Sequence, residues 1–415
     1  MGSRSRAGQS SIAIVSAKTD KRPDQPGRGA LERAAALSSN SVEALPEGGL
    51  ARQLDREAPL RIKLGIDPTA PDIHLGHTVV LNKLAQFQDA GHQVMLIIGD
   101  YTARVGDPSG RSDQRPMLTP DQIDANAATF QEQAFKILDR SRTEVRFNSE
   151  WLRMEAEELF SLMAKATIAR LLERDDFQKR IEAEKPISAL ELLYPLLQGY
   201  DSVAIDAEVE LGGTDQKFNL LFGRDVQAAY DRPQQTVMTM PILPGIDGVR
   251  RMSKSLGNYV GVTDPPEEMF GKLMRVPDTS LNEYWQLLLG EDPPAGESPS
   301  EAKRELGRRL VARFHDEEAA AGAEEQFNRL FVRHEAPAEI DDFELIADGE
   351  VHLPAALAEI FGISRSEARR VLTQGGVKRD GEVLPPEPLD YPVSELDGSV
   401  LQLGKRRFGR LRIKA

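Results

Sequence analysis

Two short apolar runs on either side of an amphipathic segment constrain the fold of this chain more than any other feature. Residues 61–66, RIKLGI, and residues 93–101, QVMLIIGDY, are strand-like and bounded by turn-forming residues. Between them apolar residues recur near the helical period, at Leu75, Val79, Leu81, Leu84 and Phe87. A strand, a helix and a strand within about forty residues predict a βαβ unit with a right-handed crossover. We therefore expect an α/β fold with a parallel sheet, whose ligands bind at the carboxyl ends of the strands.

Length and composition limit the class of protein. The 415 residues are too many for one hydrophobic core, so we expect several domains. There is no cysteine, which excludes disulfides, thiolate zinc sites and cysteine nucleophiles and fits a reducing cytoplasm. No apolar run approaches the length of a membrane helix. These features predict a cytoplasmic protein that does not contact a membrane.

Changes of pattern along the chain predict four parts. Residues 1–30 are rich in Ser, Gly, Arg and Pro and predict a disordered extension, with an organelle transit peptide as the alternative. Residues 31–262 contain the βαβ pattern, with a charged helical insertion around 114–185. Residues 263–345 read as helices, and residues 346–415 as a small α+β domain with two helices and a hairpin that turns at Asp380-Gly381.

The stretch PDIHLGH places His74 and His77 around the first turn of the predicted helix. Backbone N–H groups are unpaired there and the helix dipole is positive, so an anion is favoured. Gly76 has no side chain, so a phosphate or a flat base can approach the backbone. This arrangement suits the charge that develops on a polyphosphate during nucleotidyl transfer. Two exposed histidines that only cap a helix are the alternative, and a metal site would need a third ligand that the nearby sequence does not offer.

A second stretch, residues 248–262, contains Met252-Ser253-Lys254-Ser255 between glycines. A lysine on a flexible loop can act as a mobile point charge that closes over pyrophosphate. Alone, the stretch would be read as a solvated basic loop. A His-Leu-Gly-His stretch after a first strand and a Met-Ser-Lys-Ser stretch about 175 residues later together resemble the two signatures of class I aminoacyl-tRNA synthetases.

The resemblance extends from about residue 61 to the C-terminus, and it is closest to the bacterial tyrosyl-tRNA synthetases. It implies a Rossmann-like, parallel-sheet nucleotide-binding catalytic domain followed by an α-helical anticodon-stem domain. It also implies a small C-terminal RNA-binding domain and a homodimer. The implied reaction is a tyrosine–tRNA ligation, in which tyrosine and ATP form tyrosyl-adenylate and pyrophosphate and tyrosine then passes to the 3′ end of tRNA(Tyr).

The segment LLYPLLQGYDSVAID places Tyr194, Gln198 and Asp201 at i, i+4 and i+7, on one face of a helix. A solvated polar stripe is the alternative. The resemblance implies instead that these residues bind tyrosine. Tyr194 and Gln198, with Asp107, would hold the ammonium, and Asp201 would accept a hydrogen bond from the phenol. Gln216, in the segment LGGTDQ, would meet the amino-acid end.

The same resemblance implies the residues that handle ATP. The expected catalytic residues are Thr69, His74, His77, Arg251 and Lys254. The expected ATP-binding residues are Gly65, Asp67, Gly76, Gly213, Asp215, Met252, Ser253 and Lys254. ATP would be a substrate and Mg²⁺ would accompany its phosphates, with no metal bound by the protein alone.

Two positions depart from the family pattern. Lys63 stands where several members have a tyrosine that contacts the phenol, which leaves two alternatives. Its side chain turns away while another group completes the site, or its ammonium pairs with a carboxylate. Arg251 stands where lysine is commoner, which keeps the charge but not the compact ammonium geometry.

The tail carries an excess of positive charge on an acidic chain. From Ser364 onward there are eleven Lys and Arg against seven Asp and Glu, whereas the whole chain has a net charge of −14. Such a contrast indicates contact with nucleic acid, although a solvated basic surface is the alternative. The resemblance assigns RNA-phosphate contacts to Arg365, Arg369, Arg370, Lys378 and Arg379.

Three other functions remain as alternatives. A tryptophanyl enzyme of the same class is the nearest, but Asp201 suits a phenol and the tail is usual for the tyrosyl enzymes. A small-molecule adenylyltransferase can share the histidine signature, but it lacks the Lys254 loop. A non-catalytic RNA-binding paralogue would keep the fold, but it would not need His74, His77, Lys254 and Gln216.

Overall fold

The computed structural model describes residues 26–108, 119–333, 340–404 and 407–414. They divide into two compact units. The first unit comprises Met1–Thr69, Val80–Ala127 and Leu138–Pro241, and the second comprises Ala70–Val79, Ala128–Ile137 and Ile242–Ala415. The histidine stretch therefore groups with the C-terminal half of the chain, although the strand that precedes it belongs to the first unit.

A six-stranded sheet forms the centre of the first unit. Its strands are β1 (Glu43–Leu45), β2 (Arg61–Ile66), β3 (Gln93–Ile98), β4 (Thr143–Phe147), β5 (Val209–Gly213) and β6 (Thr236–Met240). They lie in the order β1-β6-β5-β2-β3-β4, and all neighbours are parallel except β1, which pairs antiparallel with β6. The predicted βαβ unit is confirmed, with α3 (Leu75–Asp89) between β2 and β3.

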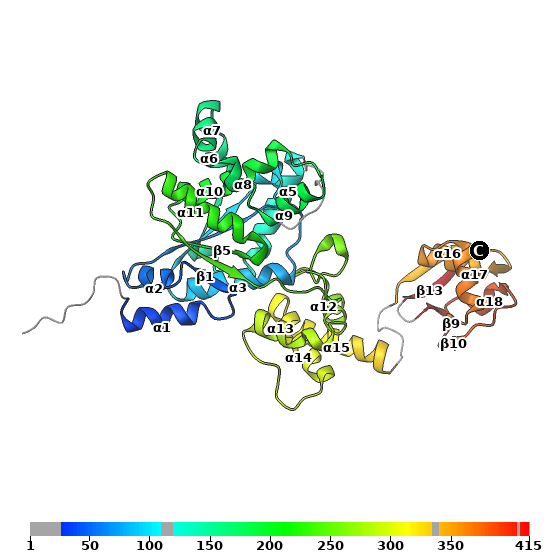
Figure 1. Ribbon diagram of the computed structural model, residues 1–415. Coiled ribbons are helices and arrows are strands. Elements are labelled where there is room, and N and C mark those ends of the chain that lie inside the picture. The colour runs from blue at the N-terminus through cyan, green and yellow to red at the C-terminus, as the bar shows by residue number, and fades with distance from the viewer. Residues whose placement is uncertain (1–25, 109–118, 334–339, 405–406, 415) are drawn as a thin grey trace, which may run out of the picture. The chain divides into compact units, whose positions relative to one another are not determined.

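The strand order reverses between β2 and β5, and this reversal decides where the helices lie. The chain moves one way from β2 to β3 and the other way from β5 to β6, so right-handed crossovers put their helices on opposite faces. Figure 1 shows α10 (Ala189–Ala204) and α11 (Lys217–Ala229) on one face and α3 on the other. Ligands of such sheets bind at the reversal, outside the carboxyl ends of the strands.

The segment 114–185 is only partly the helical insertion that the sequence predicts. From residue 119 it contains α5 (Pro120–Ala134), η1 (Arg140–Arg142), α6 (Ser149–Leu152), α7 (Ala156–Met163), α8 (Ile168–Leu171) and α9 (Asp175–Glu182). It also supplies β4, an edge strand of the main sheet. The sequence TEVRF has no apolar run because every residue of this strand is only half-buried, so periodicity did not reveal it.

A helix overlaps the stretch predicted to be a disordered N-terminal extension. Residues 1–25 lie outside the described part of the chain, but α1 (Arg28–Leu37) begins within the stretch predicted to be disordered. Ala30, Ala34 and Leu37 of this helix are buried, which explains why it is ordered despite its Gly-rich start. α2 (Gly49–Leu54) follows and packs against α1.

Helices make up most of residues 266–332 in the second unit. They are α12 (Pro266–Leu273), α13 (Asp278–Leu289), α14 (Pro299–Phe314), α15 (Glu317–Phe327) and a π-helical turn, η4 (Asn328–Val332). Phe270 and Trp285 are fully buried among them. A Cβ at Gly307 of α14 would lie 2.8 Å from the Phe270 ring, so this glycine allows α12 and α14 to approach each other. None of the helices in the described part of the chain combines the length and the apolarity needed to cross a bilayer.

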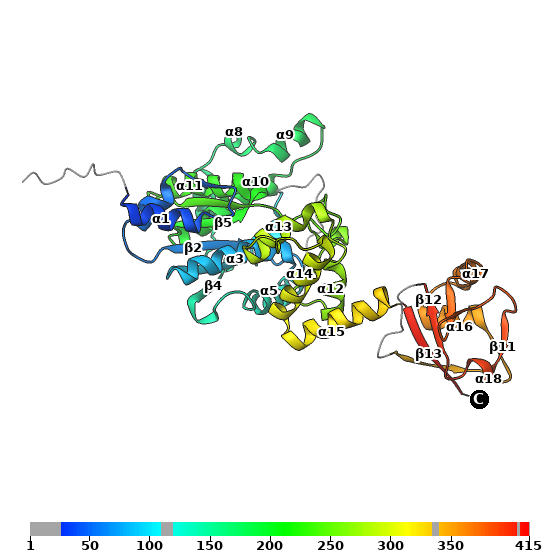
Figure 2. The same cartoon turned by 90° about the horizontal axis from the view of Figure 1, so that it is seen from below.

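The tail has a sheet and a core of its own. Its strands are β7 (Asp342–Ile346), β8 (Glu350–His352), β9 (Val377–Arg379), β10 (Glu382–Val383), β11 (Asp390–Pro392), β12 (Val400–Leu403) and β13 (Arg407–Lys414). Five strands pair in the order β10-β9-β12-β13-β7, and β11 pairs with β8. Its helices are α16 (Leu353–Phe361), α17 (Arg365–Thr373) and α18 (Val393–Leu396), with α16 and α17 side by side in Figures 1 and 2. The predicted hairpin is confirmed, with Asp380 and Gly381 at φ 49° and 91° between β9 and β10.

Candidate functional site

Six polar residues predicted from the sequence gather beyond the carboxyl ends of the strands in the first unit. We call them the α10 cluster; they are Asp67, Asp107, Tyr194, Gln198, Asp201 and Gln216. Helix α10 continues through Pro195 and keeps the predicted i, i+4, i+7 register. A capping box formed by Ser188 and Glu191 fixes its start. The helix therefore presents three side chains of the cluster from one face.

Asp201 is held by two neutral donors that sequence reasoning missed. The indole Nε1–H of Trp151 donates to Oδ1 over 2.8 Å, and the amide of Asn148 donates to Oδ2 over 3.4 Å. Burial raises the pKa of Asp201 to about 6, while the ammonium of Lys63 and these two hydrogen bonds act to lower it. Near neutral pH the side chain is therefore a desolvated carboxylate with orientation fixed on both oxygens. Such a group strongly favours a hydrogen-bond donor on a ligand.

The two alternatives for Lys63 are decided by its contacts. Its ammonium forms an ion pair with Oε1 of Glu210 at 2.9 Å and donates to the Gln198 carbonyl at 3.0 Å and to Oγ of Ser202 at 2.8 Å. An ammonium has three N–H donors, so all of them are used. Lys63 therefore pairs with a carboxylate, and no donor remains for a ligand.

Gln198 presents an acceptor to its surroundings. Its amide nitrogen donates to Oε1 of Glu210 at 3.3 Å. Its amide oxygen is buried and has no hydrogen-bond partner among the described residues. A buried acceptor of this kind is costly unless a ligand supplies a donor. An ammonium group on a bound ligand would satisfy it.

Asp67 joins the ends of the two strands of the βαβ unit, β2 and β3, to α10. It accepts hydrogen bonds from the Tyr194 hydroxyl at 3.0 Å and from Oγ1 of Thr102 at 2.6 Å, at the start of α4 (Thr102–Val105). Burial raises the pKa of Asp67 to about 7, and Asp107 adds to this. Any side chain at Gly99 would collide with the Asp67 carboxylate, so glycine is required there. The resemblance placed Asp67 with ATP, whereas its side-chain contacts in the structure are with Tyr194 and Thr102.

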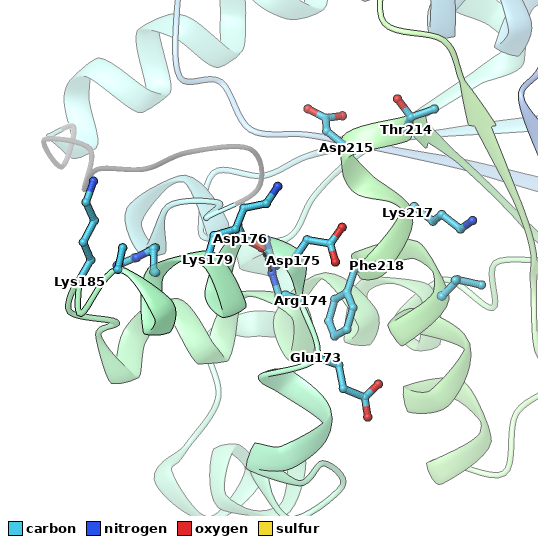
Figure 3. Close-up of a pocket in the computed structure, with 13 residues that line it drawn as sticks. Glu173, Arg174, Asp175, Asp176, Lys179, Lys185, Thr214, Asp215, Lys217 and Phe218 are labelled. Atoms are coloured by element: carbon cyan, nitrogen blue, oxygen red, sulfur yellow. Dashed lines mark hydrogen bonds and ion pairs between the residues drawn. The ribbon is translucent and has the colours of Figure 1, made fainter.

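The end of β5 brings a further pair into the cluster. The Gln216 amide, in η2 (Thr214–Gln216), donates to Oδ2 of Asp107 at 2.7 Å. Gly213 ends β5, and Asp215 follows it at the mouth of a cleft of about 780 Å³. Figure 3 shows this cleft between Arg174, Asp175, Asp176 and Lys179 around the start of α9 and Thr214, Asp215 and Phe218 around the start of α11. The cleft leaves room for a ligand beside Asp215.

Gly65 and Thr69 lie on either side of Asp67 in the chain. A Cβ at Gly65 would meet nothing within 4 Å, so packing within the protein does not demand glycine at this exposed position. The Thr69 amide donates to the carbonyl of Asp67 at 2.7 Å, which closes a tight turn after β2. Both positions are compatible with close approach of a ligand to the backbone.

In the second unit, His74 and His77 form a stacked pair. Their ring centroids lie 3.8 Å apart, and Nδ1 of His77 accepts a hydrogen bond from the His74 amide at 3.2 Å. This bond leaves Nε2 of His77 as the N–H donor. Burial lowers the pKa of His77 to about 4, and burial together with His77 and Lys254 lowers that of His74 to about 2. Both rings are therefore neutral donors at neutral pH, not cations.

Gly76 allows this stacking. A Cβ there would lie 3.0 Å from the His74 ring and 3.6 Å from Cβ of Met252. The residue is thus a point of contact between the two signature stretches. The sequence had explained Gly76 only by access for a ligand, and the structure adds a packing reason.

The stretch 252–262 runs antiparallel to the histidine stretch, although the two are far apart in the chain. The Leu75 amide donates to the Val260 carbonyl at 2.9 Å, and the Val262 amide donates to the Ile73 carbonyl at 2.9 Å. Tyr259 lies with its ring centroid 6.3 Å from that of His74. These backbone bonds fix both signatures in one place within the second unit.

The expected phosphate-binding lysine carries an ion pair with Asp72. Lys254 begins η3 (Lys254–Leu256), and its ammonium bonds Oδ2 of Asp72, with both side chains about one third exposed. The Ser253 amide donates to Asn258 at 2.9 Å, and Met252 is buried. Arg251 is exposed and forms an isolated bridge with Pro244. Sequence reasoning missed Asp72, the partner that Lys254 holds in this structure.

The basic residues of the tail lie on α17 and the β9–β10 hairpin. Arg365, Arg369 and Arg370 are exposed, and Arg370 pairs with Glu367 at 3.2 Å. Lys378 and Arg379 are half-exposed, with Arg379 at 3.4 Å from Glu395. They form a surface with the charge that RNA phosphates require.

Neither unit offers a metal site of protein ligands alone among its described residues. No three His, Asp or Glu side chains of that part of the chain are grouped to hold an ion.

Comparison with known proteins gives one family. The model that describes tRNA synthetases class I (W and Y) matches residues 55–332. The proteins named tyrosine–tRNA ligase of Moorella thermoacetica and Geobacter sulfurreducens are 49% and 48% identical to this chain. Their alignments cover 90% and 92% of this chain and 94% and 98% of theirs.

Solved structures agree on the fold. A C-terminally truncated mitochondrial tyrosyl-tRNA synthetase of Aspergillus nidulans superposes with a TM-score of 0.61 at 23% identity, over 73% of this chain and 94% of that one. A tyrosyl-tRNA synthetase of Archaeoglobus fulgidus, complexed with L-tyrosine, gives 0.60 at 21% identity, over 70% and 99%.

Proposed function

The chain belongs to the class I tRNA synthetases of the tryptophan and tyrosine group, and on that premise we propose how its residues carry out the ligation of tyrosine to tRNA. In the first step a carboxylate oxygen of tyrosine attacks the α-phosphorus of ATP, and the bond to the bridging oxygen breaks to release pyrophosphate. In the second, a ribose hydroxyl at the 3′ end of tRNA attacks the activated carbonyl and AMP leaves. No protein nucleophile is needed, so catalysis consists of positioning and charge stabilisation.

In the first unit the α10 cluster binds tyrosine. The buried amide oxygen of Gln198 accepts from the substrate ammonium, with Tyr194 and Asp107 beside it. Asp201 accepts from the phenol hydroxyl. Gln216 contacts the carboxyl end, and Gly213 and Asp215 receive the ribose of the adenylate next to the open cleft. Gly65, Asp67 and Thr69 serve ATP from the turn after β2.

In the second unit the two signature stretches act on the phosphates. His74 and His77 donate hydrogen bonds as neutral imidazoles, and Gly76 keeps their backbone accessible. Lys254 leaves Asp72 to meet the departing pyrophosphate, assisted by Arg251 and the Met252–Ser253 backbone. Mg²⁺ enters as part of the ATP substrate and neutralises charge on its phosphates.

The orientation of Asp201 is the single observation that carries the choice of tyrosine. A desolvated carboxylate fixed by Trp151 and Asn148 suits a phenol O–H and not the indole of tryptophan, whose N–H lies elsewhere on a larger ring. ATP–pyrophosphate exchange measured with each of the twenty amino acids tests the assignment. Exchange should require tyrosine. Exchange supported by tryptophan, or the absence of exchange with every amino acid, would contradict the assignment.

The remainder of the chain binds RNA and a second copy. We assign anticodon-stem contacts to residues 263–345 and phosphate contacts to the basic surface of residues 346–415.

Three large apolar side chains on α7 and α8, Phe160, Met163 and Ile168, are 63%, 42% and 66% exposed, and burial in a homodimer would remove them from water. Sedimentation of Phe160→Asp tests this, since a monomer is expected and an unchanged dimer would contradict it.

Translation consumes charged tRNA, so we place the enzyme in the cytoplasm. A fusion of residues 1–60 to a fluorescent protein, followed by cell fractionation, distinguishes this from the transit-peptide alternative. Recovery of the fusion in the cytoplasmic fraction is expected, and import into an organelle with cleavage would overturn it.

A further inference from the structure

A fully buried ion pair in the first unit has no part in the reaction as described so far. The side chains of Lys63 and Glu210 are 0% and 1% exposed, with their charged atoms 2.9 Å apart. Burying two charges is expensive, and hydrophobic residues often fill such a space at least as well. The pair comes from adjacent parallel strands, β2 and β5, at the point where the strand order reverses. Its position beneath α10 suggests a task in ligand recognition.

Glu210 fixes which end of the Gln198 amide is left for a ligand. Its Oε1 bonds Lys63 and accepts from the Gln198 amide nitrogen, and its Oε2 accepts from Ser202 at 3.1 Å and from the Gln235 amide. A carboxylate only accepts, so the Gln198 nitrogen must turn toward it. The buried Gln198 oxygen is left as the end of the amide that is available to a ligand, which suits an ammonium and not an acceptor.

Lys63 holds the turn of α10 on which Asp201 lies. Its bonds to the Gln198 carbonyl and the Ser202 hydroxyl fall on either side of Asp201 in the chain. The charged groups that act on Asp201 are Lys63 from β2, Glu210 from β5 and Asp67 after β2, while its two direct partners, Trp151 and Asn148, are neutral. Asp201 in turn acts on Asp67 and Tyr194. Lys63 is therefore the cation that offsets the negative charge of Asp201.

The geometry points to the Lys63–Glu210 pair as the positioning device for tyrosine selection in this chain. Glu210 orients Gln198 for the substrate ammonium, and Lys63 supports Asp201 for the phenol without touching the substrate. This inference rests on the proposed function of the α10 cluster. It also explains how the site works with lysine at a position where several family members use a tyrosine.

The test is the pH profile of the tyrosine-over-phenylalanine ratio of kcat/KM. Groups that serve both amino acids equally cancel in the ratio, so its acid limb reports the carboxylate that meets the phenol. Asp67, which is coupled to Asp201, is present in every variant and so does not change the direction of the shifts between them. We expect a midpoint near pH 6 in the unmodified enzyme, from the pKa of about 6 of Asp201. Lys63→Met should move it up, and Glu210→Gln should move it down, each by about one unit. At pH 6 the ionised fraction of Asp201 should fall from about a half in the unmodified enzyme to about a tenth in Lys63→Met. The tyrosine-over-phenylalanine ratio should therefore fall about fivefold.

Glu210→Gln has a second expected effect. Gln198 loses its fixed orientation, so KM should rise severalfold for tyrosine and phenylalanine alike, with kcat less affected. Lys83→Met is the matched control, because Lys83 is a second buried lysine that bonds Ser39 and Gln86 instead of α10. It should leave the midpoint and the ratio unchanged. A role of the pair in stability alone would not move the midpoint in opposite directions.

A single variant can lose its fold, because it leaves one buried charge without its partner. Lys63→Met/Glu210→Gln removes both charges, and circular dichroism checks its fold. Since Lys63 influences Asp201 more than Glu210 does, the midpoint in the double variant should still move up, by less than in Lys63→Met. Unchanged midpoints, or shifts in one direction for both single variants, overturn the inference. An unmodified enzyme that fails to activate tyrosine contradicts the proposed function instead.

Discussion

At the scale of single residues, the proposed selectivity for tyrosine depends on which protein groups are left to form a hydrogen bond with the hydroxyl of a ligand. Asp201 is buried, its two oxygens are oriented by Trp151 and Asn148, and Lys63 has no donor left to share. A phenol would complete this arrangement, whereas phenylalanine would leave a desolvated carboxylate without its partner. On the proposed function, discrimination between tyrosine and phenylalanine would therefore come from the cost of an unmet hydrogen bond more than from shape.

Asp201→Ala should reduce the tyrosine-over-phenylalanine ratio of kcat/KM by at least about tenfold. A hydrogen bond to a charged group contributes roughly 1.5–3 kcal/mol, which corresponds to that factor or more. Asp206→Ala is the matched control, because Asp206 follows the same helix but faces Arg232, with 55% of its side chain exposed. Selectivity retained in Asp201→Ala would mean that the phenol binds elsewhere.

His74→Ala and Lys254→Ala should slow adenylate formation far more than they weaken tyrosine binding. In the proposed mechanism the neutral imidazole and the ammonium meet phosphate charge that grows in the transition state, so their loss should appear in the rate. Each loss should cost roughly 2.7–4 kcal/mol if it resembles the loss of one oxyanion donor. Pre-steady-state rates at saturating tyrosine and ATP measure this. Lys303→Ala is the control, because Lys303 pairs with Asp278, outside both signature stretches. Unchanged rates in both variants would remove these residues from the mechanism.

At the scale of elements, the loop with Lys254 is held in two ways. Backbone hydrogen bonds join residues 260–262 to the histidine stretch, and the Lys254 side chain is held by Asp72. The backbone bonds join buried residues, whereas the ion pair is about one third exposed, so another anion can replace Asp72 at low cost. The loop is thus anchored at its end while its lysine can change partner.

Asp72→Asn should lower KM for ATP because Lys254 no longer has to leave a carboxylate. Partly exposed ion pairs contribute up to about 1 kcal/mol, so the decrease should not exceed about fivefold. The effect should shrink at high ionic strength, where the pair is screened. Glu268→Gln, which removes a carboxylate from Lys272, is the control. A higher KM for ATP would instead assign Asp72 a direct part in binding ATP or its magnesium.

At the scale of the whole molecule, the tail is separable because it has its own core. Leu357, Leu372, Leu401 and Leu411 are buried together from its helices and strands. β7 belongs to this sheet through its parallel pairing with β13. A cut near Asp348 would therefore leave β7 behind without its partner, and a cut before Ile340 is the better one.

A chain that ends at Arg333 should still form tyrosyl-adenylate but charge tRNA poorly. Its remaining tRNA binding should depend less on salt, because each lost phosphate contact removes about one unit from the slope of log K against log salt. Filter binding across salt concentrations and aminoacylation rates measure both effects. In the full chain, Arg365→Ala/Arg369→Ala should reproduce part of the loss, whereas Arg412→Ala, beside Asp342, serves as the control. Normal charging by the truncated chain would give the tail another task.

The sequence by itself determined what depends on neighbours along the chain. The β2–α3–β3 unit, the register of Tyr194, Gln198 and Asp201, and the hairpin at Asp380-Gly381 were all predicted, because periodicity and turn chemistry act over a few residues. The two signature stretches were found by their residue types. Edge strand β4 escaped detection because it is half-buried and shows no strong alternation.

Only the tertiary structure decided the partners of these residues. Trp151 and Asp201 are 50 residues apart, Lys63 and Ser202 are 139 apart, and Lys254 and Asp72 are 182 apart. No local pattern encodes such pairs, because packing and the strand order bring them together. Lys63 shows the limit clearly: its sequence position allowed either a turn away from the site or an ion pair. The burial of Glu210 on the neighbouring strand decided between them, since a desolvated carboxylate requires a cation nearby.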